Sequence, residues 1–297
     1  MNQYKGVIII NPEANPHINK KIERLKEEAK HLNMTLDVIT NDGTMAKINK
    51  DGSILIPFKC DFVIYLDKDI YFAKILEQAG YKIFNDSNFL KLCDDKMLTH
   101  IALANHDIRM PKTIASPLIY KNEINEENYK FLDSIARELG YPLVIKRVYG
   151  SLGEGVYLAH DIDELKTIYR ENFKYPLLFQ EYIDSSKGRS MRVIVIDEKI
   201  IGAIERYNDD DFRSNFGKSN HSKAIKLDEE CIDLINKIND VLHIKYAGID
   251  LLYDKDGPVL CEINSNAFFE EFEKETGINV AISFLRMIID DIKKEGN

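Results

Sequence analysis

Two apolar segments near the end of the chain flank a short run of turn-forming residues. Residues 248–252 and 260–264 have the composition of strands, and the residues between them include Asp, Gly and Pro. This spacing predicts a hairpin in which the two strands pair. Asp250 lies in the first strand, and Glu262 and Asn264 lie two apart in the second, so we expect all three side chains on one face of a sheet.

Asp250, Glu262 and Asn264 together offer two carboxylates and an amide oxygen, which are ligands that Mg²⁺ prefers. Apolar residues flank both acids, and paired carboxylates are costly to bury without a cation. The alternative is an exposed hairpin edge on which water solvates the acids. These residues alone leave a metal site and a solvated edge both open.

The composition of the 297-residue chain is that of an ordinary soluble protein with two or three domains. The net charge of −9 argues against a generic nucleic-acid or anionic-membrane surface. No apolar run approaches the roughly 20 residues that span a bilayer. The four cysteines have no metal or redox spacing, and the start does not resemble a signal peptide. We therefore expect no nucleic-acid partner, no membrane partner, reduced thiols and a cytoplasmic location.

The first part of the chain alternates strand-like and helix-like segments, which predicts a small parallel α/β domain. We expect strands at residues 6–10, 36–39, 61–65 and 82–84, and helices at 17–33 and 69–79. Residues 11–16 replace the G-x-G-x-x-G that a dinucleotide-binding turn would need after the first strand.

The rest of the chain mixes both element types, so the whole is α/β or α+β in class. We expect helices at residues 94–105, 129–139, 161–172, 228–242 and 277–293, strands at 143–146, 156–158 and 177–183, a looped 117–128, and several strands between 192 and 254.

A glycine-rich loop follows the strand that ends at Lys146. The loop at residues 150–155 holds three glycines, whose backbone amides can approach a phosphate, although an ordinary hairpin turn has the same composition. It lies between two strands, so it is neither a P-loop nor a Rossmann turn. Lys146 follows apolar residues, and a buried ammonium needs an anion such as a nucleotide phosphate. The alternative is a lysine that extends to the surface.

Further polar residues follow the next strands. Gln180 and Glu181 end an apolar strand, where they could border an adenine and a ribose or simply leave the core. Arg192, Arg206 and Arg213 carry guanidinium groups, which bind phosphates and carboxylates bidentately. If the three arginines converged on the oxygens of Asp250, Glu262 and Asn264, they would supply the positive charge that phosphoryl transfer needs, although each arginine alone could be structural.

From Asp95 to the C-terminus the chain resembles the ATP-grasp superfamily and, within it, the RimK-like amino-acid ligases. The resemblance rests on segments in a fixed order. They are residues 95–98, 142–146, 150–155, 180–183, 204–206, 211–215, 247–250, 262–264 and 273–281.

The resemblance implies three domains: a pre-ATP-grasp α/β domain at 1–94, a central or lid subdomain at 95–183, and a C-terminal subdomain with the magnesium site at 184–297. It also implies site roles. The ATP phosphates would be contacted by Lys96 and Lys146, and the lid over them would be formed by Gly150, Ser151, Gly153 and Gly155. The adenine would be bordered by Gln180, Glu181 and Tyr182. Phosphate and the reacting carboxylate would be bound by Arg192, Arg206, Arg213, Ser214 and Asn215, and two Mg²⁺ or Mn²⁺ ions would be held by Asp250, Glu262 and Asn264.

The implied reaction is attack of a carboxylate on the γ-phosphate of ATP, giving an acyl phosphate and ADP, followed by attack of an amine. The implied substrates are amino acids or short peptides, and the implied assembly is a dimer or tetramer. Three alternatives remain: a thiol or carrier-protein acceptor, a ribosomal-peptide acceptor, and an inactive nucleotide-binding scaffold. The identities of the carboxylate and the amine stay open.

Two places depart from the family pattern. Ser190 stands where many relatives carry a carboxylate that binds the ribose. Phe268 and Phe269 replace a small Pro-Gly turn after Asn264, which suggests either an acceptor pocket for an apolar or aromatic group or plain core packing. His221 could touch substrate or lie in a surface loop.

Overall fold

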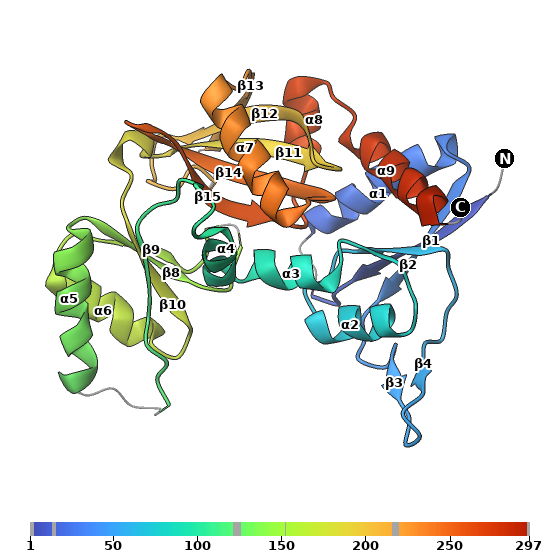
Figure 1. Cartoon of the computed structure of the whole chain (residues 1–297), viewed down its shortest axis with the longest axis horizontal. Helices are drawn as coiled ribbons and strands as arrows, with labels where there is room; N and C mark the ends of the chain where they lie inside the picture. Colours follow the sequence, from blue (N-terminus) through green and yellow to red (C-terminus); the bar gives the residue numbers. More distant parts are fainter. Residues whose placement is uncertain (1–2, 14–15, 121–125, 152, 216–219, 296–297) are drawn as a thin grey trace.

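The computed structural model describes residues 3–13, 16–120, 126–151, 153–215 and 220–295. Leu152 of the glycine loop, and parts of the predicted segments 11–16 and 117–128, therefore lie outside the described residues. Three main sheets organise the chain, with the C-terminal sheet lying between the N-terminal and central ones (Figure 1). No helix among the described residues has the length and apolarity needed to cross a bilayer.

The N-terminal sheet is parallel and has the strand order β2-β1-β5-β6, as the alternating segments predicted. Its elements are β1 (Tyr4–Ile10), α1 (His17–His31), β2 (Met34–Thr40), β5 (Phe62–Tyr65), α2 (Ile70–Gln78) and β6 (Ile83–Phe84). A small hairpin of β3 (Lys47–Ile48) and β4 (Ile54–Leu55) was not predicted, because its two-residue strands are too short to carry a period.

The helix predicted at about 94–105 is present, but the chain forms two helices that meet at Asp95, and the first of them was not predicted. These are α3 (Ser87–Asp94) and α4 (Lys96–Leu103). Asp95 has extended backbone angles, and its carboxylate accepts a hydrogen bond from the Leu98 amide, so it caps α4. Lys96 is consequently the first residue of α4.

The central sheet is antiparallel, with the order β7-β10-β8-β9. Its strands are β7 (Thr113–Ala115), β8 (Leu143–Arg147), β9 (Val156–Ala159) and β10 (Leu177–Glu181). The helices α5 (Lys130–Leu139) and α6 (Ile162–Asn172) share one apolar core with β8 and β10, and the 3₁₀ turn η1 (Glu126–Tyr129) leads into α5. The predicted loop between β8 and β9 therefore projects from a sheet braced on one face.

The C-terminal sheet has five antiparallel strands in the order β13-β12-β11-β14-β15. They are β11 (Arg189–Ile196), β12 (Lys199–Asn208), β13 (Asn220–Ile225), β14 (Tyr246–Asp254) and β15 (Gly257–Asn264), preceded by the 3₁₀ turn η2 (Asp184–Ser186). The helix α7 (Glu229–Leu242) packs its apolar residues on one face of this sheet. The predicted hairpin is confirmed, since β14 and β15 pair with Asp250 opposite Glu262.

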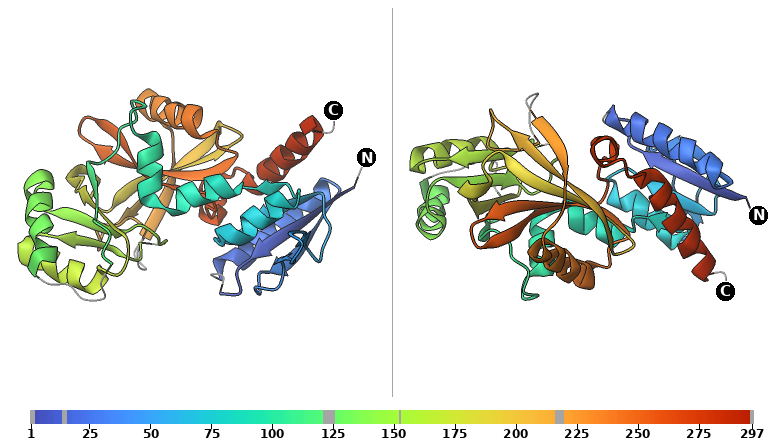
Figure 2. Two further views of the ribbon diagram at one scale, coloured as in Figure 1. Left: turned by 60° about the horizontal axis from the view of Figure 1, so that its bottom comes forward. Right: turned by 90° about the horizontal axis from the view of Figure 1, so that it is seen from above.

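The last two helices join the N-terminal part of the molecule. They are α8 (Glu270–Thr276), which was not predicted, and α9 (Val280–Glu295). Apolar residues of α1, α8 and α9 form one core with the N-terminal sheet, and α9 lies alongside α1 (Figure 2). The first helix of the chain is thereby fixed against the segment that follows β15.

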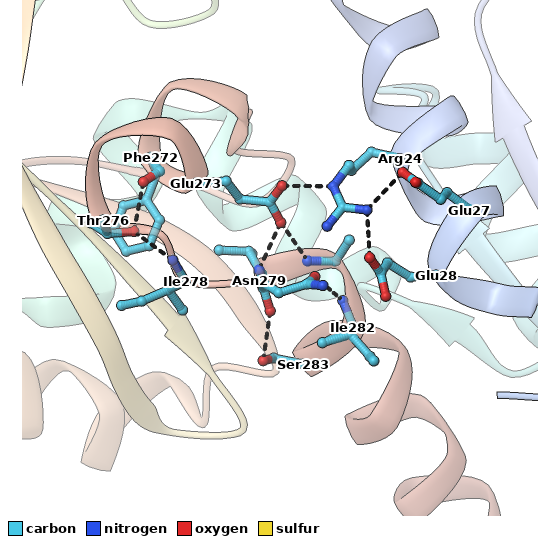
Figure 3. Close-up of polar contacts among 12 residues, drawn as sticks. Arg24, Glu27, Glu28, Phe272, Glu273, Thr276, Ile278, Asn279, Ile282 and Ser283 are labelled. Atoms are coloured by element: carbon cyan, nitrogen blue, oxygen red, sulfur yellow. Dashed lines mark hydrogen bonds and ion pairs between the residues drawn. The ribbon is translucent and has the colours of Figure 1, made fainter. Parts of the chain in front are cut away.

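An ionic network ties α1 to the start of α9 (Figure 3). Arg24 Nε donates to Glu273 Oε2 at 2.9 Å, and Arg24 Nη1 donates to Glu28 at 2.5 Å. The other oxygen of Glu273 accepts from the Val280 and Ala281 amides at 2.8 and 3.1 Å, which satisfies the helix N-terminus. One glutamate thus caps α9 and holds α1 to it.

Candidate active site

A cleft lies between the central and C-terminal sheets. Its walls come from α4, β8, the glycine loop, β10 and the strands β11, β14 and β15. Most of the predicted site residues line it: Lys96, Lys146, Gly150, Ser151, Gly153, Gln180, Glu181, Tyr182, Arg213, Ser214, Asn215, Asp250 and Glu262. Arg192, Arg206 and Asn264 are joined to this wall through Asp250, whereas Gly155 packs against the Arg147 side chain.

The three predicted metal ligands lie together at the β14–β15 hairpin. Asn264 Nδ2 lies 3.1 Å from Glu262 Oε1 and 3.4 Å from Asp250 Oδ2. Asp250 is only 4% exposed, so the solvated-edge interpretation is wrong for this carboxylate. Across the described ranges, no group of three or more His, Cys, Asp or Glu side chains is arranged to hold a metal, so this place offers two acids and an amide.

Two arginines surround the Asp250 carboxylate. Arg192 lies directly opposite it in the β11–β14 ladder and donates through both Nε and Nη2, the latter at 2.6 Å. Arg206 on β12 adds a third bond at 2.5 Å. Burial alone would raise the pKa of Asp250, but the two arginine charges outweigh burial and hold the pKa at about 2. Asp250 is therefore ionised throughout the physiological range.

Arg206 retains a donor that its neighbours do not use. Its Nε is buried and has no hydrogen-bond partner among the residues that the structure describes. Burial and the nearby Arg192 charge lower the pKa of Arg206. A buried guanidinium with an unused N–H is suited to an additional anionic acceptor.

Arg213 does not converge on Asp250 with the other two arginines. Its Nη1 donates to the backbone oxygens of Gly153 at 2.9 Å and Val156 at 3.1 Å. Its Nε and Nη2 bind the Asp211 carboxylate, each at 2.8 Å. Arg213 consequently ties the segment after β12 to the glycine loop across the cleft, which sequence spacing could not reveal.

Two lysines lie side by side near Glu262. Lys96 Nζ donates to Gly150 O at 2.8 Å, and Lys146 Nζ lies 3.8 Å from Cys261 Sγ. Burial lowers the pKa of Lys96, the Glu262 charge raises it, and the Lys146 charge lowers it further. Clustered ammonium groups beside a backbone loop are suited to bind phosphate oxygens.

The far end of the cleft differs from the expectation for Gln180. Its amide is buried and bonds to Thr113 Oγ1 at 2.8 Å and His100 Nε2 at 3.0 Å, so the core occupies its side chain. Glu181 Oε1 accepts from the Lys112 amide at 2.8 Å. The Tyr182 ring packs edge-on against Phe212. His100 and Thr113 were missed because only the fold brings them to β10.

The structure also shows where the residues lie that depart from the family pattern. Ser190 is buried and its Oγ lies 2.6 Å from Ser214 Oγ. Phe269 is fully buried in the core, so the core-packing alternative holds for it, whereas Phe268 lies partly exposed with its ring 5.9 Å from His17. His221 lies at an exposed position of strand β13 rather than in a loop, and its ring stacks on that of Tyr207 in β12.

The sequence is similar to a known family and to known proteins. A family model for the RimK-like ATP-grasp domain matches residues 93–288. The chain is 32% identical to the uncharacterized protein MG012 of Mycoplasma genitalium, covering 95% of this chain and 98% of that protein. It is 33% identical to alpha-aminoadipate–LysW ligase LysX of Sulfurisphaera tokodaii, covering 75% and 76%.

Among solved structures, the chain is similar to the ATP-grasp ligase PsnB complexed with a phosphomimetic variant of its minimal precursor, Mg and ADP. The TM-score is 0.68 at 16% identity, over 98% of this chain and all of that one, a likeness that shows the fold. Because the family model spans the cleft and most of the chain, this protein belongs to the RimK-like ATP-grasp family of ATP-dependent carboxylate–amine ligases.

Proposed function

We propose that this protein is an ADP-forming ligase that uses ATP and Mg²⁺ to join a carboxylate to the amine of an amino acid or peptide. The observation that carries the proposal is the charge arrangement of one cleft. Two lysines and two buried arginines lie around an Asp–Glu–Asn wall, with a glycine loop beside it. No protein nucleophile is needed for a carboxylate that is activated by phosphorylation.

Lys96, Lys146 and the glycine loop are the proposed phosphate site. The two ammonium groups supply positive charge, and the backbone of Gly150, Ser151, Gly153 and Gly155 can approach the phosphates closely. Arg213 holds this loop to the opposite wall through Gly153 and Val156, so it can keep the loop closed over a nucleotide. Glu181 and Tyr182 line the adenine end in this proposal.

Asp250, Glu262 and Asn264 are the proposed ligands of Mg²⁺, which when bound would neutralise phosphate charge. A carboxylate has about four acceptor positions, and the arginines occupy three on Asp250. A cation would therefore share Asp250 with Arg192 and Arg206 and depend strongly on Glu262. Asn264 would turn its amide oxygen toward such a cation, since it now presents Nδ2 to both acids.

Arg206 is the proposed residue for the reacting carboxylate and its acyl phosphate, through the donor that it does not use internally. Arg192 holds Asp250 in place, and Ser214 and Asn215 line the same cleft. These positive groups oppose the repulsion between an incoming carboxylate and the phosphates, which is the main barrier to their approach. We also propose the division into domains 1–94, 95–183 and 184–297 as functional units around this cleft.

The proposed acceptor is the amine of an amino acid or a short peptide. LysX is named as a ligase of alpha-aminoadipate and LysW, and PsnB was captured with a precursor, so related proteins take different partners. An amino acid or short peptide is proposed here because the arginines and carboxylates at the acid wall can pair with the carboxylate and the amine of such a substrate.

The experiment is incubation of the protein with ATP, Mg²⁺ and pairs of amino acids, with ADP release and product mass both measured. We expect ADP release that requires a particular pair, together with a product lighter by one water than the sum of its substrates. Tight ATP binding without ADP release across a broad panel would instead identify a nucleotide-binding scaffold.

A further inference from the structure

A lysine from the first helix is buried behind the acid wall. Lys21 of α1 is 1% exposed, and its Nζ donates to the Ala267 carbonyl at 3.0 Å. The same carbonyl accepts from the Tyr246 hydroxyl at 2.6 Å. The ammonium lies 4.8 Å from the Tyr246 ring centre and 5.5 Å from that of Phe269. Two donors from distant parts of the chain thus converge on one backbone oxygen.

Burying the charged form of Lys21 costs free energy. In the part of the chain that the structure describes, no carboxylate forms an ion pair with it, and burial lowers its pKa to about 7. Either the ammonium or the neutral amine can donate to Ala267. Replacing a buried charge by an apolar side chain of similar size is often neutral or stabilising, so fold stability does not account for a lysine here.

The Ala267 segment lies directly against the metal wall. Ala267 follows Asn264 by three residues. A Cβ on Gly248, which pairs with Asn264 in the ladder, would come within 2.6 Å of Ala267 Cβ and 2.9 Å of Arg192 Cδ. Ala267 and the Arg192 side chain therefore both pack against Gly248, the ladder partner of Asn264. A shift of the Ala267 backbone would press on Gly248 and, through it, on residues on each side of Asp250.

A second donor from the N-terminal domain supports the same segment. Asn85, which follows β6, donates through Nδ2 to Ser265 O and Tyr246 O, each at 2.8 Å. Arg24, three residues after Lys21 on the same helix face, fixes α1 to Glu273 at the end of the segment (Figure 3). The N-terminal domain thus grips the chain just beyond Asn264 from two elements.

We propose that Lys21 is a positioning residue of the active site, which through the Ala267 carbonyl sets the placement of Asn264 and Arg192 and so the affinity for the divalent cation. The N-terminal domain thereby becomes part of the cation site without touching the cation. This inference rests on the proposed function, because it assumes that the acid wall binds a divalent cation together with nucleotide.

The test compares Lys21→Met with Lys20→Met in the full-length protein. Lys20 is the adjacent residue, and its side chain is 66% exposed. Its exposed ion pair with Glu270, at 3.7 Å, contributes little to stability. Mn²⁺ binding is measured by titration in the presence of a non-hydrolysable ATP analogue, and the denaturation midpoint is measured in parallel. Tyr246→Phe, which removes the other donor to Ala267, is an independent variant.

We expect Lys21→Met to bind Mn²⁺ about tenfold more weakly, a typical effect of losing an outer support of a metal site, without a lower denaturation midpoint. Tyr246→Phe should weaken Mn²⁺ binding in the same direction, and Lys20→Met should leave both measurements unchanged. Wild-type Mn²⁺ affinity in Lys21→Met overturns the inference. Should Lys21→Met fail to fold, unchanged Mn²⁺ affinity in Tyr246→Phe overturns it.

The wild-type titration separates this inference from the proposed function. If the wild-type protein binds no Mn²⁺ with the nucleotide analogue, the cation site itself is refuted, and the role of Lys21 with it. If the wild-type protein binds and Lys21→Met binds equally well, only the positioning role is lost.

Discussion

Arg192 and Asp250 face each other across the β11–β14 ladder, and the guanidinium grips the carboxylate through two N–H groups. Both side chains are almost fully buried. A charge left unpaired in such a place is far more costly than one at the surface. The relationship therefore fixes the charge state and orientation of a proposed metal ligand before any cation is present.

Arg192→Met should destabilise the protein by about 3 kcal/mol, because it leaves the buried Asp250 with only Arg206 as its cationic partner. Denaturant unfolding measures this loss. Lys199→Met on the neighbouring strand β12 is the control, since the Lys199 side chain is exposed. The control should lose less than about 1 kcal/mol. Equal losses in the two variants would contradict the buried-pair account.

Lys21 should make the stability of the protein depend on pH. Its pKa is lowered from 10.5 to about 7 by burial, so between these values the unfolded chain binds a proton that the folded protein has released. Stability therefore rises as pH increases from about 7 toward 10.5, and the full burial penalty is present below pH 7. Unfolding of wild type and Lys21→Met across pH 6–10 measures this. The advantage of Lys21→Met over wild type should shrink as pH rises, and a constant difference would contradict the prediction.

Arg213→Met should raise the KM for ATP about tenfold with little change in the melting temperature, because it removes two charge-assisted hydrogen bonds that hold the glycine loop across the cleft. Steady-state kinetics with varied ATP measure the effect. Faster proteolytic cleavage near Gly153 in the variant would report the loosened loop independently. An unchanged KM together with unchanged cleavage would show that Arg213 does not control the loop.

Glu262→Gln should lower kcat about a thousandfold, since it removes the carboxylate on which a shared cation would chiefly depend. Glu229→Gln at the exposed start of α7 is the control and should retain wild-type activity. Circular dichroism and melting temperature establish that both variants are folded. Wild-type turnover by folded Glu262→Gln would remove Glu262 from the metal site.

The hairpin that brings Asp250 and Glu262 together was predictable because its determinants are local: two apolar strands and a turn of Asp, Gly and Pro. The parallel N-terminal sheet was predictable because strand-like and helix-like segments alternate along the sequence. The helix α3 was missed, because its eight residues make only about two turns and carry too short a helical period.

Other features depend on contacts between distant segments. Gln180 lines the cleft, but sequence alone could not show that His100 and Thr113 hold its amide. The spacing of Arg213 could not show that it reaches the glycine loop. Lys21 looked like one of many helical lysines, and only its packing against Tyr246 and Ala267 distinguishes it. Such placements follow from tertiary structure, which overrides local pattern.

The most direct test of the central claim follows an oxygen atom. The carboxylate substrate that supports turnover is labelled with ¹⁸O at both carboxyl oxygens, and the released phosphate is analysed by mass spectrometry. Because the carboxyl oxygen that forms the acyl phosphate leaves with phosphorus, we predict one ¹⁸O in each inorganic phosphate and ADP as the nucleotide product. Unlabelled phosphate, or the formation of AMP and pyrophosphate, would contradict the account.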